Sequence, residues 1–283
     1  MPELPEVETI RRQLAERLDG RVIADLVVLD PVLVAPGDPR AFAQAVRGQA
    51  IGDLTRAGKY LLIELRGGEA LALHLGMSGQ LLWSADDGSA VTPYARAILR
   101  LDDGGLLTFA DPRRFGRAFL LPRGRAARAR AWGGRTGVDA MSARFTARTL
   151  ERSLHGRMAP VKALILDQRI VAGVGNIYAD ESLFRARVHP GRRGGTLSHD
   201  EVGRLHRGIR DRLRVGIAAG GTSFDRYRDA YGGHGGMQDL LLVHRRRGEP
   251  CLRCRTTIEK GVVAQRGTYW CPRCQPLPEG AQC

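Results

Sequence analysis

Apolar residues at helical spacing begin almost at the first residue of the chain. Val7, Ile10, Leu14 and Leu18 fall three or four positions apart, and a glycine follows two residues after the last of them. This spacing places the four side chains on one stripe of a helix. Residues 6–18 are therefore predicted to form an amphipathic helix with one buried face.

Short apolar or alternating runs follow over residues 21–121. They are separated by Gly and Asp turns and read RVIADLVVL, YLLIEL, ALALHL, QLLW, AILRL and LLTFA. Runs of this length predict β-strands, and several of them at short intervals predict a β-sandwich or a barrel.

Helical patterns replace the strands after PRGRAARARAWGGRTG, a region rich in Arg, Ala and Gly that is predicted to be a hinge or linker. The predicted helices are SARFTARTLERSLHG, PVKALILDQ, NIYADESLFRA and SHDEVGRLHRGIRDRLRVGIAA. A glycine-rich segment, GGTSFDRYRDAYGGHGG, precedes the C-terminal part. The pattern predicts an α+β multidomain protein with a sandwich domain over residues 1–132, a helical domain over 133–240 and a small domain over 241–283.

All five cysteines lie in the predicted small domain. Two CxxC pairs, Cys251 with Cys254 and Cys271 with Cys274, are separated by sixteen residues that alternate as a two-stranded hairpin would, with Gly267 among them. This spacing predicts a four-thiolate Zn²⁺ site, which is closed and therefore structural rather than catalytic. Disulfides are the alternative, and they are disfavoured because the first residues show neither the basic start nor the apolar run of a secretory signal. Cys283 is left over and is expected to be an idle thiol.

Charge narrows the class of partner. The 283 residues contain 44 Lys and Arg against 30 Asp and Glu, which gives a net charge of +14 and a pI near 10.5. This balance indicates a polyanionic partner, with nucleic acid ahead of a membrane surface, although a composition bias toward Arg is the plain alternative. No stretch has the roughly 18 consecutive apolar residues that a membrane span requires, so an integral membrane protein is excluded.

Five motifs occur in an order that identifies a resemblance. They are MPELPEVET, HLGMSG, DPRRFG, VAGVGNIYADESLF and the terminal CxxC pairs. The chain resembles bacterial formamidopyrimidine-DNA glycosylases over essentially its whole length. The resemblance implies an N-terminal β-sandwich, a helical domain with a helix-two-turns-helix motif, and a zinc finger. It also implies an enzyme that excises oxidised purines such as 8-oxoguanine and formamidopyrimidines from duplex DNA and then cleaves the strand by β,δ-elimination.

The N-terminal tip is where the resemblance implies catalysis. Removal of Met1 would expose the secondary amine of Pro2, and an α-amino group with a pKa near 8 has a useful neutral fraction at pH 7. Such an amine can attack the sugar C1′ and form a Schiff base. The resemblance makes Pro2 the nucleophile and Glu3 the acid/base, with Glu6 as a supporting carboxylate. The alternative for both glutamates is stabilisation of the helix N-terminus by their charge.

Further residues are implied to contact DNA near the reacting sugar. Lys59 in RAGKYLLIEL and His74 in HLGMSG match phosphate-contacting positions, the lysine lying close to the catalytic centre. A solvated lysine and a strand histidine are the plain alternatives. Met77, Arg113 and Phe115 lie in turn-like segments and match residues that fill the gap left by an everted nucleotide, Arg113 pairing with the orphaned cytosine.

The second half of the chain supplies the remaining implied contacts. Asn176 opens a helix after Gly173 and Gly175, where free backbone N–H groups can hold a phosphate, and a simple helix cap is the alternative. Lys162 matches a lysine near the damaged nucleotide. Arg266, on the zinc hairpin, matches an arginine that binds phosphate beside the lesion.

The chain departs from the family pattern at three positions. His244 stands where a tyrosine commonly contacts DNA phosphate, Met237 stands where an aromatic residue is often found, and Tyr94 replaces a histidine. Weakened phosphate binding is expected at His244. These differences bear on the range of damaged bases more than on the reaction type.

Two other functions are compatible with parts of the sequence. An endonuclease VIII-like enzyme would prefer oxidised pyrimidines, but that branch usually begins PEGPE, whereas this chain has PELPEVE. A lesion-binding protein without catalysis would share the basic surface, but it would not need Pro2, Glu3 and Lys59 together. The expected partner is damaged double-stranded DNA, bound by a monomer in the bacterial cytoplasm at the nucleoid.

Overall fold

The structure is a computed structural model that describes residues 1–85, 92–224 and 226–277. Cys283 lies outside these residues. The chain divides into two compact units. Unit 1 contains Met1–Gly134 and Ala219–Gly236, and unit 2 contains Arg135–Ala218 and Met237–Cys283. Within the described ranges, no helix has the length and apolar character that crossing a membrane requires.

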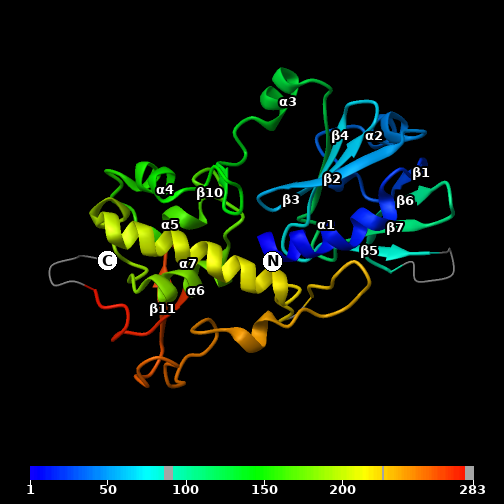
Figure 1. Cartoon of the computed structure of the whole chain (residues 1–283). Coiled ribbons are helices and arrows are strands. Elements are labelled where there is room, and N and C mark those ends of the chain that lie inside the picture. Colours follow the sequence, from blue (N-terminus) through cyan, green and yellow to red (C-terminus); the bar gives the residue numbers. More distant parts are fainter. Residues whose placement is uncertain (86–91, 225, 278–283) are drawn as a thin grey trace. The chain divides into compact units, whose positions relative to one another are not determined.

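Unit 1 contains two four-stranded antiparallel sheets (Figure 1). One has the order β1 (Ile23–Val28), β6 (Ala95–Leu101), β7 (Leu106–Ala110) and β5 (Gln80–Ser84). The other has the order β2 (Ile51–Ala57), β3 (Tyr60–Leu65), β4 (Ala70–His74) and β8 (Arg117–Leu121). Buried side chains of both sheets share one core, among them Leu26 and Leu99 of the first and Ile63 and Leu73 of the second. The predicted β-sandwich is therefore confirmed.

Helix α1 (Leu4–Leu18) closes this core, as the apolar stripe predicted. Val7, Ile10, Leu14 and Leu18 are each at most 1% exposed and belong to the same cluster as the sheets. Burial of four such side chains contributes several kcal/mol, at roughly 1.5–3 kcal/mol each. The start of the chain is thereby fixed on the sandwich instead of fraying.

Two helices of unit 1 were not predicted. Helix α2 (Pro39–Val46) lies within the strand-rich region and is capped by Asp38, which accepts from the N–H of Ala41. Helix α3 (Arg125–Trp132) lies in the predicted linker and ends at Gly133 in the left-handed conformation. The linker prediction was wrong for this helix, because Ala and Arg favour helix and outweigh the flanking glycines.

Unit 2 is mainly helical, with the predicted helices in place. They are α4 (Ala147–Leu154), α5 (Val161–Leu166), α6 (Asn176–Ala186) and α7 (His199–Ala218), and a short parallel pair joins β9 (Val138–Asp139) to β10 (Val171–Ala172). Short 3-10 turns occur at Gly194–Thr196 and Met237–Leu240 here, and at Pro31–Leu33 in unit 1. Helices α6 and α7 approach closely at Gly208, where an added Cβ would lie 2.8 Å from the Ser182 carbonyl oxygen.

The C-terminal hairpin of unit 2 pairs β11 (Glu259–Val263) with β12 (Arg266–Trp270). The predicted hairpin is confirmed, but Gly267 does not form its turn. The turn residues are Ala264 and Gln265, with φ of 51° and 59°, and Gly267 lies inside β12 opposite Val262.

Candidate active site and metal centre

The predicted nucleophile and acid lie at the buried N-terminus of α1. Pro2 is buried and Glu3 is 2% exposed, whereas Met1 is exposed. Glu3 and Glu6 form a reciprocal capping box, in which the Glu6 Oε2 accepts from the Glu3 N–H at 2.7 Å. Pro5 occupies the first turn, where its missing N–H has no cost. The capping box and Pro5 thus hold Glu3, the residue after Pro2, at the start of the helix.

Glu6 also joins the helix to the segment Ala219–Gly236 of unit 1. Its Oε1 accepts from the Thr222 N–H at 2.7 Å, and the phenol of Tyr227 donates to its backbone carbonyl at 3.4 Å. Gly221, at φ +86°, allows this approach, since a Cβ there would lie 2.9 Å from the Glu6 Cγ. Burial, and secondly the Glu3 charge, raise the pKa of Glu6 to about 7.

The glycine-rich segment has further anchors on α1 and β5. The amide of Gln13 donates to Asp229 at 2.9 Å and its oxygen accepts from the Ala230 N–H at 2.9 Å, while the Trp83 N–H donates to the Ala230 carbonyl at 2.8 Å. The segment Ala219–Gly236 is therefore held against the helix on which Pro2 and Glu3 lie.

Lys59 and His74 lie on neighbouring strand ends. Lys59 follows Gly58 in the β2–β3 turn and is 5% exposed, so it is not a solvated surface lysine. His74 ends β4 opposite Tyr60, with ring centroids 4.7 Å apart. Burial, then the charges of Lys59 and Arg117, lower the pKa of His74 to about 4. His74 is therefore neutral near pH 7.

The hydrogen bonds of His74 fix its tautomer. Its Nδ1 accepts from the Gly76 N–H at 3.1 Å, so in the neutral ring the proton resides on Nε2. His74 can thus offer one neutral N–H donor to an oxygen of a ligand.

Met77, Arg113 and Phe115 lie on two turns of unit 1 that touch each other. Met77 is 41% exposed and Phe115 48% exposed, and the Arg113 guanidinium lies 5.0 Å from the Phe115 ring centroid. The turns meet at Gly76, where an added Cβ would lie 2.6 Å from the Phe115 carbonyl carbon. Two large apolar side chains and an arginine are thus displayed together, outside any core.

Asp111 organises both turns, although no role was predicted for it from the sequence. It is 1% exposed, and its carboxylate accepts from the Ser78 hydroxyl at 2.5 Å, the Arg113 N–H at 3.1 Å and the Gly116 N–H at 2.7 Å. Its place before a Pro-containing turn was the available signal. Arg114 has a structural role, with its guanidinium paired to Asp30 at 2.7 Å.

Asn176 is the first residue of α6, and Gly175 occupies the N-cap position. The simple-cap alternative is therefore wrong. The Asn176 side-chain amide donates to the Gly267 carbonyl of β12 at 3.0 Å, and this bond ties the helix start to the hairpin. Arg266, at the beginning of β12, is exposed.

Lys162 does not have the position that a direct DNA contact requires. It is fully buried, and its ammonium lies 2.7 Å from Asp180 Oδ1, 2.8 Å from the Thr268 hydroxyl and 3.1 Å from the Gly267 carbonyl oxygen. The expectation of a DNA-contacting lysine is corrected on this point. Lys162 joins α5 and α6 to the hairpin, since an unpaired charge at this depth would cost several kcal/mol.

His244 is likewise inside unit 2. It is 6% exposed, its Nδ1 lies 2.7 Å from Asp180 Oδ2, and its ring packs on Tyr269. The backbone around it is held by buried Glu181, which accepts from the N–H groups of residues 242–244. The expected phosphate donor is therefore a partner of Asp180, because the imidazole ring is bound on its Asp180 side and buried against Tyr269.

The other two departures also have defined places. Met237 is fully buried, with its sulfur 4.0 Å from the Arg212 guanidinium, so it is a packing residue of unit 2. Tyr94 is 45% exposed in unit 1, and its carbonyl accepts from the Asp111 N–H at 2.9 Å.

The four cysteines Cys251, Cys254, Cys271 and Cys274 form a metal site. Their sulfurs all lie within 4.8 Å of one another, with Cys254–Cys271 at 3.4 Å and Cys251–Cys274 at 4.0 Å. A tetrahedral ion with bonds of about 2.3 Å needs sulfurs roughly 3.8 Å apart, so the cluster fits Zn²⁺. With four thiolates the site is structural and binds one zinc ion.

Three family models match successive parts of the chain. They are the formamidopyrimidine-DNA glycosylase N-terminal domain over residues 1–118, the formamidopyrimidine-DNA glycosylase H2TH domain over residues 136–227, and the zinc finger found in FPG and IleRS over residues 248–277. The formamidopyrimidine-DNA glycosylase of Symbiobacterium thermophilum is 46% identical over 281 residues, which cover 99% of this chain and 91% of that protein.

Solved structures agree with these matches. MutM (FPG) from Thermus thermophilus superposes with a TM-score of 0.86 at 41% identity, covering 97% of this chain and 98% of that one. A Lactococcus lactis FPG mutant in complex with Fapy-dG-containing DNA superposes with a TM-score of 0.89 at 32% identity, covering 98% and 100%.

The fold and the site together define a zinc-containing DNA glycosylase with a helix-two-turns-helix domain. The chain belongs to the formamidopyrimidine-DNA glycosylase family, as the sequence predicted.

Proposed function

We propose that this DNA glycosylase removes oxidised purines, such as 8-oxoguanine and formamidopyrimidines, from duplex DNA with Pro2 as its nucleophile. The observation that supports this most directly is the buried cluster of Pro2, Glu3 and Glu6 at the tip of α1. A binding protein without catalysis would have no reason to bury two carboxylates beside its first proline, since burial of each carries a desolvation cost.

The reaction follows from the chemistry of a secondary amine. After Met1 is removed, the lone pair of the Pro2 nitrogen attacks C1′, the bond from C1′ to the base breaks, and the base leaves with that electron pair. The proton of the attacking Pro2 nitrogen passes to the departing base, which leaves the nitrogen neutral with its lone pair restored. Glu3 then donates a proton to the sugar ring oxygen, and the nitrogen lone pair breaks the C1′–O4′ bond, which opens the ring and leaves an iminium on Pro2. Abstraction of a proton from C2′, next to the iminium carbon, then expels the 3′ phosphate, and abstraction of a second proton from C4′ expels the 5′ phosphate, which together are the proposed β,δ-elimination.

Glu6 is proposed to position these groups. Its two oxygens accept backbone N–H groups from Glu3 and Thr222, so it holds the acid residue and the start of the segment Ala219–Gly236 at the same time. Binding of a flipped base against this segment would therefore be communicated directly to Glu3.

DNA is proposed to contact the remaining predicted residues in two groups. In unit 1, Lys59 and the neutral Nε2–H of His74 bind phosphate, Met77 and Phe115 fill the gap left by the flipped nucleotide, and Arg113 pairs with the orphaned cytosine. Filling the gap offsets part of the few kcal/mol that flipping costs.

In unit 2, the start of α6 at Asn176 and the exposed Arg266 are proposed to bind phosphate. Lys162 and His244 act indirectly, because both hold Asp180 or the hairpin from inside. The zinc ion would thus position Arg266 and take no part in chemistry. We further propose a monomer that acts on chromosomal DNA in the bacterial cytoplasm.

Borohydride reduction tests the proposal. Protein confirmed to have lost Met1 is incubated with a duplex containing 8-oxoguanine opposite cytosine and then reduced. A covalent protein–DNA product is expected, because the iminium is converted to a stable amine. Protein that retains Met1 is the matched control, since its proline nitrogen is a peptide nitrogen and cannot react.

Absence of a trapped product from Met1-free protein would exclude the proline mechanism. A thymine-glycol duplex is treated in parallel. Preferential trapping on that substrate would assign the chain to the oxidised-pyrimidine branch instead.

A further inference from the structure

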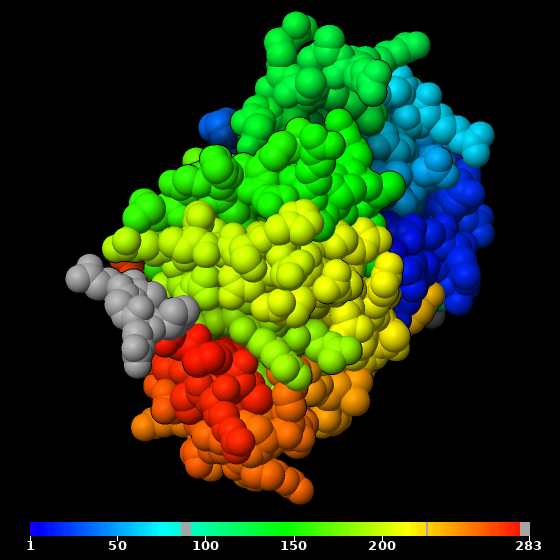
Figure 2. Space-filling view, turned by 60° about the vertical axis from the view of Figure 1, so that its left-hand side comes forward, coloured from blue at the N-terminus to red at the C-terminus, as the bar shows by residue number. Residues whose placement is uncertain are grey.

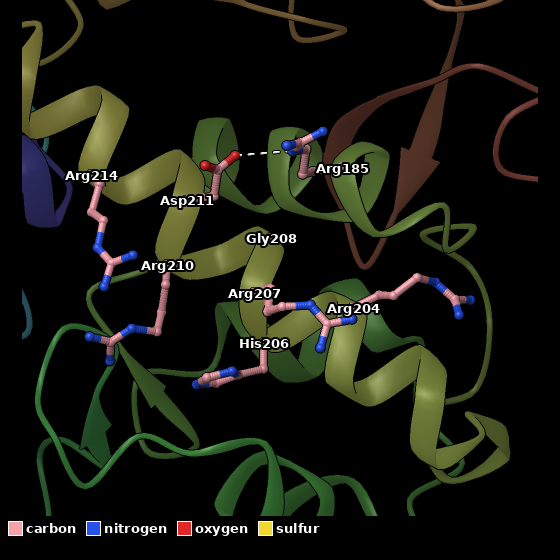
Figure 3. A pocket seen from close by; sticks show the side chains of 8 residues that line it. All are labelled: Arg185, Arg204, His206, Arg207, Gly208, Arg210, Asp211 and Arg214. Atoms are coloured by element: carbon pink, nitrogen blue, oxygen red, sulfur yellow. Dashed lines mark hydrogen bonds and ion pairs between the residues drawn. The ribbon is translucent and has the colours of Figure 1, made fainter.

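A hollow of about 530 Å³ lies on unit 2, and none of the residues that line it is assigned above to DNA or zinc. Helix α7 forms its floor and the last turn of α6 forms one wall (Figure 3). Its charged lining side chains are Arg185, Arg204, Arg207, Arg210, Asp211 and Arg214. Five guanidinium groups against one carboxylate give this surface a strong net positive charge.

Two of these arginines are fixed and two are available. Arg204 donates to the Ala186 carbonyl at 3.1 Å and Arg210 donates to the Ser142 carbonyl at 3.0 Å, so both are oriented by uncharged partners. Arg207 and Arg214 are exposed, and within the described part of the chain neither guanidinium has a hydrogen bond or ion pair. The one acid, Asp211, is paired with Arg185 at 3.0 Å. The hollow therefore has unneutralised cations.

The arginines follow one face of α7. Arg204, Arg207 and Arg214 share this face with Asp211 at intervals of three or four residues. The intervening Leu205, Ile209 and Leu213 are buried on the opposite face. Arg204 and Arg214 are ten residues apart, which corresponds to about 15 Å along the helix. One DNA strand places a phosphate about every 3.4 Å along the duplex axis, so the row matches roughly four nucleotides.

We propose that this arginine hollow is a second DNA-binding surface, which takes the backbone phosphates of an undamaged duplex segment. The hollow is also separate from the phosphate site proposed above at the start of α6. Asn176 begins that helix and Arg185 lies in its last turn, about 13 Å further along the axis. Figure 2 shows the yellow-green surface of α7 open on the face in view. A chain engaged at one lesion could hold a second segment there, which would assist transfer between segments.

Counting bound duplexes tests this inference. Undamaged duplexes of roughly ten base pairs are titrated at about 50 mM salt, and native mass spectrometry reports how many bind per chain. The chain is expected to bind two, whereas the R207A/R214A variant should bind one. Loss of two phosphate contacts predicts a second-site affinity roughly 10- to 100-fold weaker near 0.1 M salt.

The matched control is R40A/R47A at α2. It removes the same charge from two exposed arginines of unit 1, and it should still bind two duplexes. Both variants should excise 8-oxoguanine from a short duplex at the unchanged rate. The number of duplexes bound per chain does not depend on covalent trapping by Pro2. Failure of the second-surface proposal can therefore be distinguished from failure of the proposed reaction.

Each of the following results would overturn the inference. A chain that binds one duplex has no second surface, and the same conclusion follows if R207A/R214A still binds two. Slower excision by R207A/R214A would place these arginines in the main interface. The hollow would be a small-anion site if inorganic phosphate binds through Arg207 and Arg214 while no second duplex binds. If only one duplex binds and phosphate does not, an acidic protein would be left as the partner of the hollow.

Discussion

The surroundings of Glu6 act in opposite directions on the charge of its carboxylate. Its carboxylate accepts two backbone N–H groups, yet burial and the neighbouring Glu3 raise its pKa to about 7. In the unfolded chain the same group titrates near 4.5. Between these values the native state binds more protons than the unfolded state, so stability falls as the pH rises.

The E6Q variant should remove this pH dependence. The rise in the pKa of Glu6 from 4.5 to about 7 corresponds to a loss of roughly 3 kcal/mol in the free energy of unfolding, at about 1.36 kcal/mol per pKa unit. Urea unfolding at pH 5 and pH 8 should therefore show that the free energy of unfolding of the wild type falls between these pH values. That of E6Q should fall less, by an amount of the order of 3 kcal/mol. E16Q, on the exposed face of α1, should track the wild type. A difference between E6Q and wild type that is equal at both pH values would contradict the assignment.

His74 should contribute to DNA affinity as a neutral donor. Because its pKa is lowered to about 4, it carries no charge at pH 7, and its loss removes one hydrogen bond without releasing a counterion. The H74L variant should bind a lesion duplex about 5- to 20-fold more weakly, at roughly 1–1.8 kcal/mol for one bond. Fluorescence anisotropy should give an unchanged slope of log affinity against log salt. A slope smaller by about 0.9 would mean that His74 binds phosphate as a cation.

At the scale of elements, the two turns that display Met77, Arg113 and Phe115 depend on Asp111. Asparagine in its place would offer an NH₂ group where the carboxylate now accepts from Ser78, Arg113 and Gly116. We expect D111N to lose about 1–3 kcal/mol of stability, since buried donors lose their acceptor. Excision of 8-oxoguanine should fall more than binding of undamaged DNA, because the turns act on the flipped state.

The D53N variant provides the comparison for D111N. Asp53 is exposed on β2 of the same unit, so its loss should leave both properties unchanged. Equal losses of excision and of undamaged-DNA binding in D111N would show that the turns support general binding instead of flipping. Single-turnover excision and equilibrium binding separate the two cases.

Elements with a local signal were predictable from the sequence. The apolar stripe of α1 and the two CxxC turns encode their own geometry within a few residues, and both are present in the structure. Helix α2 also had a signal, Asp38 followed by Pro39, which is a typical helix start.

Burial across long sequence separations was not predictable. Lys162 was expected to contact DNA because it matches a family lysine near the damaged nucleotide. The sequence carries no local sign that Thr268, 106 positions later, packs against its ammonium. His244 was expected to donate to phosphate because it stands at a tyrosine position of the family pattern. Its contact with Asp180, 64 positions before it, has no local signal in the sequence. Pattern analysis identifies which face of one element is apolar, but it cannot identify which polar groups of two elements will meet inside the fold.

At the scale of the whole molecule, the net charge of +14 should dominate affinity for undamaged DNA. If roughly six to ten phosphates are neutralised, the equilibrium constant should fall by about 10³ to 10⁵ between roughly 50 and 200 mM salt. Titration of a labelled duplex over this range measures the slope. A flat response would contradict the electrostatic interpretation and would leave the arginine content as a composition bias.

The burial of Lys162 limits how the zinc finger can be exchanged during evolution. Its hairpin supplies two oxygen partners of that ammonium, the Gly267 carbonyl and the Thr268 hydroxyl, and Gln275 donates to the Val188 carbonyl at 2.9 Å. A recombination event that replaced residues 248–277 alone would leave the Lys162 ammonium with Asp180 but without these two hairpin oxygens, unless the new ribbon supplied them again. Successful exchange would have to transfer the ribbon together with α5 and α6, so these segments should be inherited as a block.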